Sequence, residues 1–142
     1  MSTPARLTFV DTKVLVYAHD STEPERRPVA QRLLLDLWNS GNGALSTQVL
    51  QEFYSTTTCR IRQPLRPAVA RTAVAQYSEW RTVDTDPLLI ISAARMAAEH
   101  SIAFWDALII EAALRCDAYQ LLTEDMQDGR RFGSLTVRNP FK

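Results

Sequence analysis

LTFVD, residues 7–11, is a short apolar run that ends on an aspartate. A similar run returns late in the chain in YQLLTED, residues 119–125. Both have the length and composition of short buried strands, bounded by polar residues. We therefore predict two strands that lead into the carboxylates of Asp11 and Asp125.

Between and beside these runs, apolar residues recur at the spacing of amphipathic helices. We expect helices over residues 26–39, 48–58 with Thr47 as N-cap, 69–77, 88–100 and 104–115. Further short strands are expected at 44–46, within 81–87 and within 134–141. The segment VLVYA, residues 14–18, is interpreted as an apolar turn after the first strand.

Strands and helices thus alternate, which favours an α/β fold with a central parallel sheet of about four to five strands. Helices are expected on both faces, giving a single three-layer domain over residues 1–142. In such sheets the binding crevice lies at the carboxyl ends of the strands, where Asp11 and Asp125 are predicted to lie.

Composition limits the classes of protein that fit. The apolar fraction is 46%, the charged fraction 23%, and sixteen acidic residues balance sixteen basic ones. These values are typical of a folded globular protein, and no apolar run reaches the roughly 18 residues of a membrane span. The start of the chain has no apolar leader segment, so a cytoplasmic location without membrane contact is expected.

Arginine supplies almost all of the positive charge, and it is clustered. Guanidinium groups bind phosphate in a bidentate manner, so such clusters are candidates for RNA binding, Arg130 and Arg131 among them. A solvated helix face with ion pairs explains the clusters equally well. They lie at Arg60, Arg62, Arg66 and Arg71, and at Arg130, Arg131, Arg138 and Lys142.

Any metal site in this chain must be built from carboxylates. The cysteines and histidines are isolated and fit no zinc spacing. Acidic residues instead stand beside apolar segments, at Asp11, Glu52, Asp106 and Asp125. Four converging carboxylates would repel one another, and Mg²⁺ or Mn²⁺ would compensate that repulsion.

Each acid also has a structural explanation. Asp11 and Asp125 suit the caps of turns or helices, and Glu52 suits a solvated helix surface. Asp106 is followed at helical spacing by apolar residues, which places its carboxylate on the core-facing stripe if the helix includes it. Alternatively, Asp106 is the N-cap of a helix that starts at Ala107.

Four segments in order resemble those of the PIN-domain ribonucleases, and most closely the VapC-like toxins of type II toxin–antitoxin systems. The resemblance covers essentially the whole chain. The segments are FVDTKVLVYAHD (9–20), STQVLQEFY (46–54), FWDALIIEAAL (104–114) and LLTEDMQDGRRFGSLTVRNPF (121–141).

The resemblance implies a Mg²⁺- or Mn²⁺-dependent endoribonuclease that hydrolyses RNA, is inhibited by a cognate antitoxin and forms a homodimer. By position, the metal-binding and catalytic acids are similar to Asp11, Glu52, Asp106 and Asp125. Thr123 is expected to support the site, Asp128 to be an outer ligand or a turn cap, and Glu124 to face solvent.

One residue departs from the family pattern. The opening motif usually reads Asp-Thr-Asn, and Lys13 replaces the Asn. In an extended segment, residues 11 and 13 point the same way, so the ammonium is able to pair with an acid or to reach a phosphate. An exposed Lys13 is equally consistent with the sequence.

The rival hypothesis is a PIN-like binding module with weakened catalysis that acts through protein partners. Lys13 favours this hypothesis, and retention of all four acids opposes it. The aromatic residues Trp38 and Trp80 are expected to pack in the core, whereas Trp105 is expected to shape the wall beside Asp106.

Overall fold

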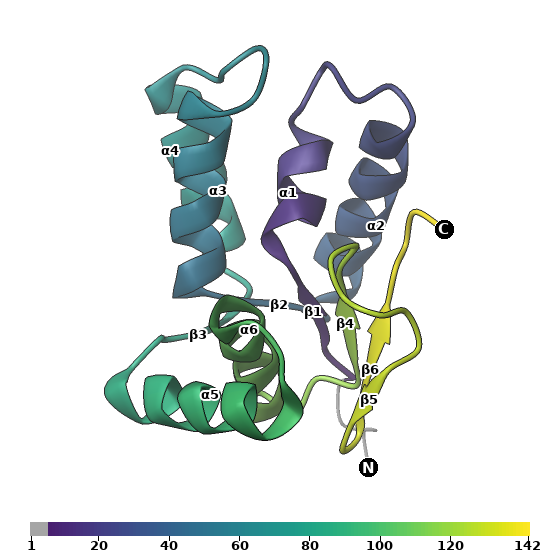
Figure 1. Ribbon diagram of the computed structural model, residues 1–142. Helices are drawn as coiled ribbons and strands as arrows, with labels where there is room; N and C mark the ends of the chain where they lie inside the picture. The colour runs from purple at the N-terminus through teal and green to yellow at the C-terminus, as the bar shows by residue number, and fades with distance from the viewer. Residues whose placement is uncertain (1–5) are drawn as a thin grey trace.

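The computed structural model describes residues 6–142, and strands alternate with helices along them (Figure 1). The expected absence of an apolar leader segment rests largely on residues 1–5, which lie outside the described residues. The elements are β1 (Thr8–Val10), α1 (Thr12–Ala18), α2 (Arg26–Ser40), β2 (Gly43–Ser46), α3 (Thr47–Cys59), α4 (Pro67–Tyr77), β3 (Arg81–Val83), α5 (Pro87–His100), α6 (Phe104–Arg115), β4 (Gln120–Leu122), β5 (Arg131–Phe132) and β6 (Leu135–Arg138).

The strands form one sheet in the order β3-β2-β1-β4-β6-β5. Strands β3, β2, β1, β4 and β6 are all parallel to one another, which confirms the expected parallel sheet. The two-residue strand β5 was not expected, and it pairs antiparallel with β6. A tight turn with Gly133 at φ 60° joins them, because glycine adopts this left-handed conformation without strain.

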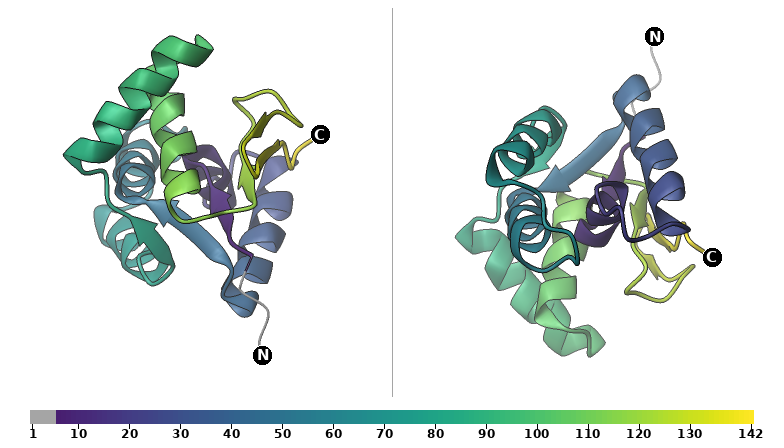
Figure 2. Two further views of the ribbon diagram at one scale, coloured as in Figure 1. Left: turned by 90° about the horizontal axis from the view of Figure 1, so that it is seen from below. Right: turned by 90° about the horizontal axis from the view of Figure 1, so that it is seen from above.

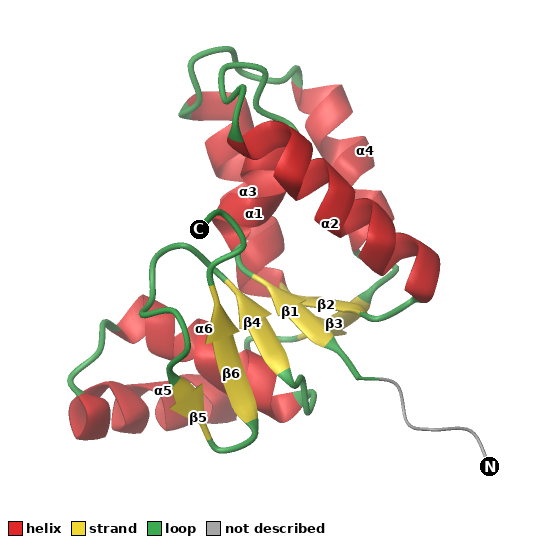
Figure 3. Cartoon of the chain, turned by 90° about the vertical axis from the view of Figure 1, so that its right-hand side faces the viewer, coloured by secondary structure: helices red, strands yellow, loops and turns green. Residues whose placement is uncertain are grey.

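Helices cover the sheet from two sides. Figures 1 and 3 show α1 to α4 gathered on one side of the strands and α5 with α6 on the other. In both views of Figure 2, α2 and the α5–α6 pair lie on opposite sides of the strands. The central strands are therefore buried on both faces, and Phe9, Val10, Leu45 and Leu121 are fully enclosed.

The first helix corrects the sequence prediction. Residues 14–18 form most of α1 rather than a turn. Their helical periodicity is hidden because α1 is short and nearly all of its side chains are buried. Thr47 is likewise the first residue of α3 and not its cap, since the hydroxyl of Ser46 accepts the hydrogen bond from Val49 N.

Two tryptophans pack together beside the start of β2. The rings of Trp38 and Trp80 lie 6.2 Å apart, and Trp80 packs over Gly43 at the start of β2. Trp38 remains 43% exposed, so the expected core packing holds only partly for it. No helix within residues 6–142 is long and apolar enough to cross a membrane.

Replacing Gly43 with Ala should lower the free energy of unfolding by about 1–3 kcal/mol, measured by urea denaturation. The new methyl carbon would lie 2.5 Å from the Trp80 ring, so the indole must move out of its packed position. The double variant Gly43→Ala/Trp80→Leu should lose less than the sum of the two single variants. Strictly additive losses would rule out this contact as the cause.

Candidate active site

An acidic cavity lies at the carboxyl ends of the central strands. The sheet reverses its order of strands between β1 and β4, and such a reversal leaves a crevice at that edge. The cavity there has a volume of about 320 Å³. Its lining includes Asp11, Glu52, Asp106 and Asp125, which come from four separate segments of the chain.

Asp11 stands at the junction of β1 and α1. One carboxylate oxygen accepts from the backbone N–H of Thr12 at 2.7 Å, so Asp11 is also the N-cap of α1. The other accepts from the hydroxyl of Thr123, also at 2.7 Å. Burial raises the pKa of Asp11 to about 6, the two hydrogen bonds oppose that rise, and the charges of Asp125 and Glu52 add to it. The capping and site hypotheses for Asp11 are therefore compatible.

Glu52 lies in the second turn of α3 and reaches the cavity from an exposed position. Its carboxylate accepts a hydrogen bond of 3.1 Å from the hydroxyl of Thr12, the residue after Asp11. This bond links α3 to the start of α1. Thr12, which the sequence analysis overlooked, thus contacts two of the four acids through its backbone and its side chain.

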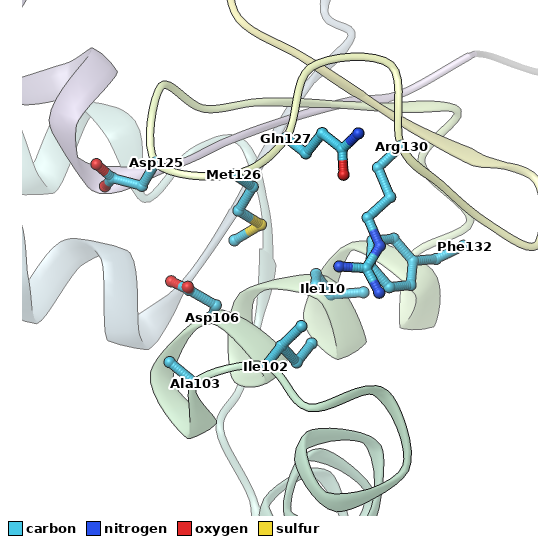
Figure 4. Close-up of a pocket in the computed structure, with 9 residues that line it drawn as sticks. All are labelled: Ile102, Ala103, Asp106, Ile110, Asp125, Met126, Gln127, Arg130 and Phe132. Atoms are coloured by element: carbon cyan, nitrogen blue, oxygen red, sulfur yellow. The ribbon is translucent and has the colours of Figure 1, made fainter.

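Asp106 lies in the first turn of α6, which begins at Phe104, so Asp106 is not the helix N-cap. Figure 4 shows its carboxylate facing that of Asp125 across the space between α6 and the loop after β4. Partial burial raises the pKa of Asp106, and the negative charge of Asp125 raises it further. Its neighbour Trp105 is 64% exposed and lines the same cavity, as expected for a wall residue.

Lys13 reaches into this acidic cavity from the first turn of α1. Lys13 is helical rather than extended, and its side chain is exposed, as one alternative had it, yet still pairs with an acid, as the other had it. The Nζ atom lies 2.7 Å from an oxygen of Asp125, and that hydrogen bond raises the pKa of Lys13. One of the acids therefore already has a positively charged partner.

The residues of the closing segment have different surroundings. Thr123 is buried and bonds Asp11, whereas Asp128 is exposed and accepts from the backbone N–H of Asn139 at 2.8 Å. Asp128 does not line the acidic cavity.

Glu124 does not face solvent, contrary to expectation. Its carboxylate accepts from the hydroxyl of Tyr17 and pairs with Arg26 at 3.0 Å, and only 16% of its side chain is exposed. Although burial opposes ionisation, these two partners lower its pKa. No local pattern predicts this contact because it joins residues of three distant segments.

The two candidate RNA-binding arginines, Arg130 and Arg131, have different positions relative to the cavities. Arg130 lines a smaller cavity that Asp106 and Asp125 share, while Arg131 is exposed on β5 and lines neither cavity. Arg60, from the other arginine cluster, lines the larger cavity together with Gln48. Gln48 carried no sequence signal, since it is a single buried polar residue in the first turn of α3.

The chain was compared with curated protein sequences, solved structures and protein-family profiles. Curated protein sequences yield no match. Among solved structures, the chain is similar to a toxin–antitoxin complex from Klebsiella pneumoniae, with 17% identity over 94% of this chain and 97% of that one and a TM-score of 0.68. It is also similar to VapBC2 from Rickettsia felis bound to a promoter DNA fragment, with 18% identity over 94% of this chain and 98% of that one and a TM-score of 0.63. A third similar structure is VapC20 of Mycobacterium tuberculosis, a sarcin–ricin loop cleaving toxin, with 22% identity over 80% of this chain and 86% of that one and a TM-score of 0.62.

These structural likenesses are at low identity and establish a shared fold. The sequence itself matches the family profile described as PIN domain over residues 8–127. That stretch contains the four acids of the cavity and the helices and strands that position them. The chain therefore belongs to the PIN-domain family.

Proposed function

We propose that this protein is a Mg²⁺- or Mn²⁺-dependent endoribonuclease and the toxin of a toxin–antitoxin pair. The observation that carries the proposal is the convergence of Asp11, Glu52, Asp106 and Asp125 on one cavity at the switch point of the sheet. Membership of the PIN-domain family and the likeness to solved toxins support the same activity.

The residues of the cavity fit a hard divalent cation. The donors are carboxylate oxygens, which Mg²⁺ and Mn²⁺ prefer. Asp11 is buried and has no ion-pair partner among residues 6–142, so a cation would offset an otherwise costly charge. As they stand, no three acidic, histidine or cysteine side chains of the described chain are close enough to hold a metal ion. We propose that small side-chain movements complete the ligand set.

In the reaction, an oxygen of water bonds to phosphorus, and the bond from phosphorus to a ribose oxygen breaks, that oxygen taking up a proton. A bound divalent ion would activate the water and stabilise the charge that develops on the phosphate. Hydrogen bonds from Thr12 and Thr123 restrain the carboxylates of Asp11 and Glu52 at the cavity. Arg60 supplies positive charge on the cavity wall for the RNA backbone.

The proposed protein partners are an antitoxin and a second copy of the chain. A solved toxin–antitoxin complex of this fold supports the first. The helix α2 leaves Leu35 56% and Trp38 43% exposed, and we propose that the antitoxin covers this side. The helix α5 leaves Leu88 69% and Ile91 54% exposed, which is a candidate surface for the second copy.

A second candidate function is a PIN-like binding module with weakened catalysis. The ion pair of Lys13 with Asp125 favours it, because the ammonium uses an oxygen that a metal ion would otherwise bind. The two functions differ in metal affinity and in RNA cleavage.

The purified protein should cut RNA in Mn²⁺ and lose that activity in EDTA. Replacing Asp106 with Asn should slow cleavage by about a hundredfold, since the change removes a charged donor from the cavity. Asp128→Asn is the matched control because it makes the same change on an acid outside the cavity, and it should cut like the wild type. Equal activity of all three proteins would refute the assignment of Asp106.

Replacing Asp11 with Asn should stabilise the metal-free protein at pH 7.5 by roughly 3 kcal/mol. The wild type should lose stability as pH rises from about 4 to about 6, because the folded state holds the Asp11 proton up to its raised pKa. The two proteins should converge near pH 4, as measured by urea denaturation in EDTA. Added Mn²⁺ should stabilise the wild type more than the Asn variant. The reverse ranking at pH 7.5 would contradict a costly charge at Asp11.

Replacing Lys13 with Asn should tighten Mn²⁺ binding about tenfold, measured by isothermal titration calorimetry. The change frees the Asp125 oxygen that Nζ contacts. Arg60→Gln removes a charge from the same cavity without breaking an ion pair among residues 6–142, so it should have a smaller effect. An inactive wild type together with an active Lys13→Asn variant would show that Lys13 silences the nuclease, whereas an inactive variant would favour the binding module. Equal affinities would show that Lys13 does not compete.

A further inference from the structure

A second, smaller cavity adjoins the acidic one. Its volume is about 190 Å³, and Asp106 and Asp125 line both cavities, so the two meet at these carboxylates. Figure 4 shows the smaller cavity between the start of α6 and the loop that joins β4 to β5. A molecule bound in the acidic cavity can therefore extend directly into the smaller one.

Apolar side chains form part of the walls of the smaller cavity, and polar side chains form the rest. Ile102 and Ile110 come from the α6 side, and Met126 and Phe132 come from the β4–β5 side. Ile110 and Phe132 also belong to the hydrophobic core, so their positions are fixed by packing. Such walls suit a flat apolar surface more than a hydrated ion.

Two polar side chains complete the lining, Gln127 and Arg130. The Arg130 guanidinium lies 4.7 Å from the centre of the Phe132 ring. Within residues 6–142, neither polar side chain makes a hydrogen bond or an ion pair. Both therefore have free donors, and Gln127 also has a free acceptor.

The backbone that carries these side chains is held by β6. Gly129 N donates to Val137 O at 2.8 Å, and Val137 N donates to Arg130 O at 2.8 Å. Arg130 N also donates to Gln127 O, which closes the turn. The cavity is thus formed in advance of any ligand, which reduces the entropic cost of binding.

We infer that this second cavity is a base pocket, which takes the nucleobase of the nucleotide next to the cleaved phosphate. The inference rests on the proposed RNA cleavage. A base has flat apolar faces for Ile102 and Met126 and polar edges for Gln127, and proteins read unpaired bases by these two means. An inorganic anion fits less well, because Asp106 and Asp125 stand at the junction and repel it.

The test is nuclear magnetic resonance of protein with ¹³C-labelled methionine methyl groups, titrated without metal with the four ribonucleosides. The Met126 methyl signal, assigned with Met126→Leu, should shift and saturate with at least one nucleoside because a base ring would lie beside it. The Met96 methyl, 8% exposed in the core, should not move. Ribose 5-phosphate should give no shift at Met126. A shift with ribose 5-phosphate alone, or none with any nucleoside, would overturn the base pocket.

Variants locate the binding. Ala103→Leu fills the cavity from an exposed position at the start of α6 and should weaken nucleoside binding about tenfold. Arg130→Gln should weaken it as well, whereas Arg131→Gln, the same change one residue outside the cavity, should not. Equal effects of the two arginine variants would overturn the inference.

The nucleoside titration needs neither metal nor cleavage. A folded protein that never cuts RNA but shifts at Met126 would leave the pocket standing without the nuclease. Cleavage that depends on Asp106 without any shift at Met126 would leave the nuclease without the pocket.

Discussion

The carboxylate of Asp11 lies where β1 passes into α1, and burial there raises its pKa to about 6. A charge at this depth is costly, and the surrounding chain is arranged around it. Thr123 from the segment after β4 and the backbone of Thr12 both donate to it. These bonds hold two neighbouring strand ends and the first helix in one arrangement. Within residues 6–142, no cation forms an ion pair with Asp11.

The parallel sheet explains why the other acids arrive at the same place. Parallel strands end at one edge, and a helix that follows a strand starts there, whereas a helix that leads back into a strand begins at that same edge and runs to the other. Glu52 lies near the beginning of α3, which follows β2, and Asp125 lies in the loop after β4. Asp106 lies in the first turn of α6, which follows α5 and leads back into β4. The acidic cavity is therefore a consequence of the topology. The ion pair of Lys13 with Asp125 gives one of these acids a cationic partner from the chain itself.

Much of the fold was predictable because apolar residues recur at helical spacing in most of its helices. The span of α6 was predicted to the residue, and α2 and α5 to within one residue at either end. The failures were short elements. Helix α1 is buried almost all round, so it lacks a visible period, and β5 has only two residues and depends on its pairing with β6. In both cases tertiary burial, rather than local propensity, decides the conformation.

The sequence by itself determined the alternation of strands and helices, the PIN-like segments and the oxygen-only chemistry of any metal site. These depend on residue types and spacing along the chain. The tertiary structure decided which neighbours each acid has. It paired Lys13 with Asp125, removed Glu124 from solvent through Tyr17 and Arg26, and placed Arg130 but not Arg131 beside the acids. The pairs lie about a hundred positions apart in the sequence, and the two arginines are adjacent in it but differ in their surroundings. Only the packing of the sheet and its helices fixes these arrangements.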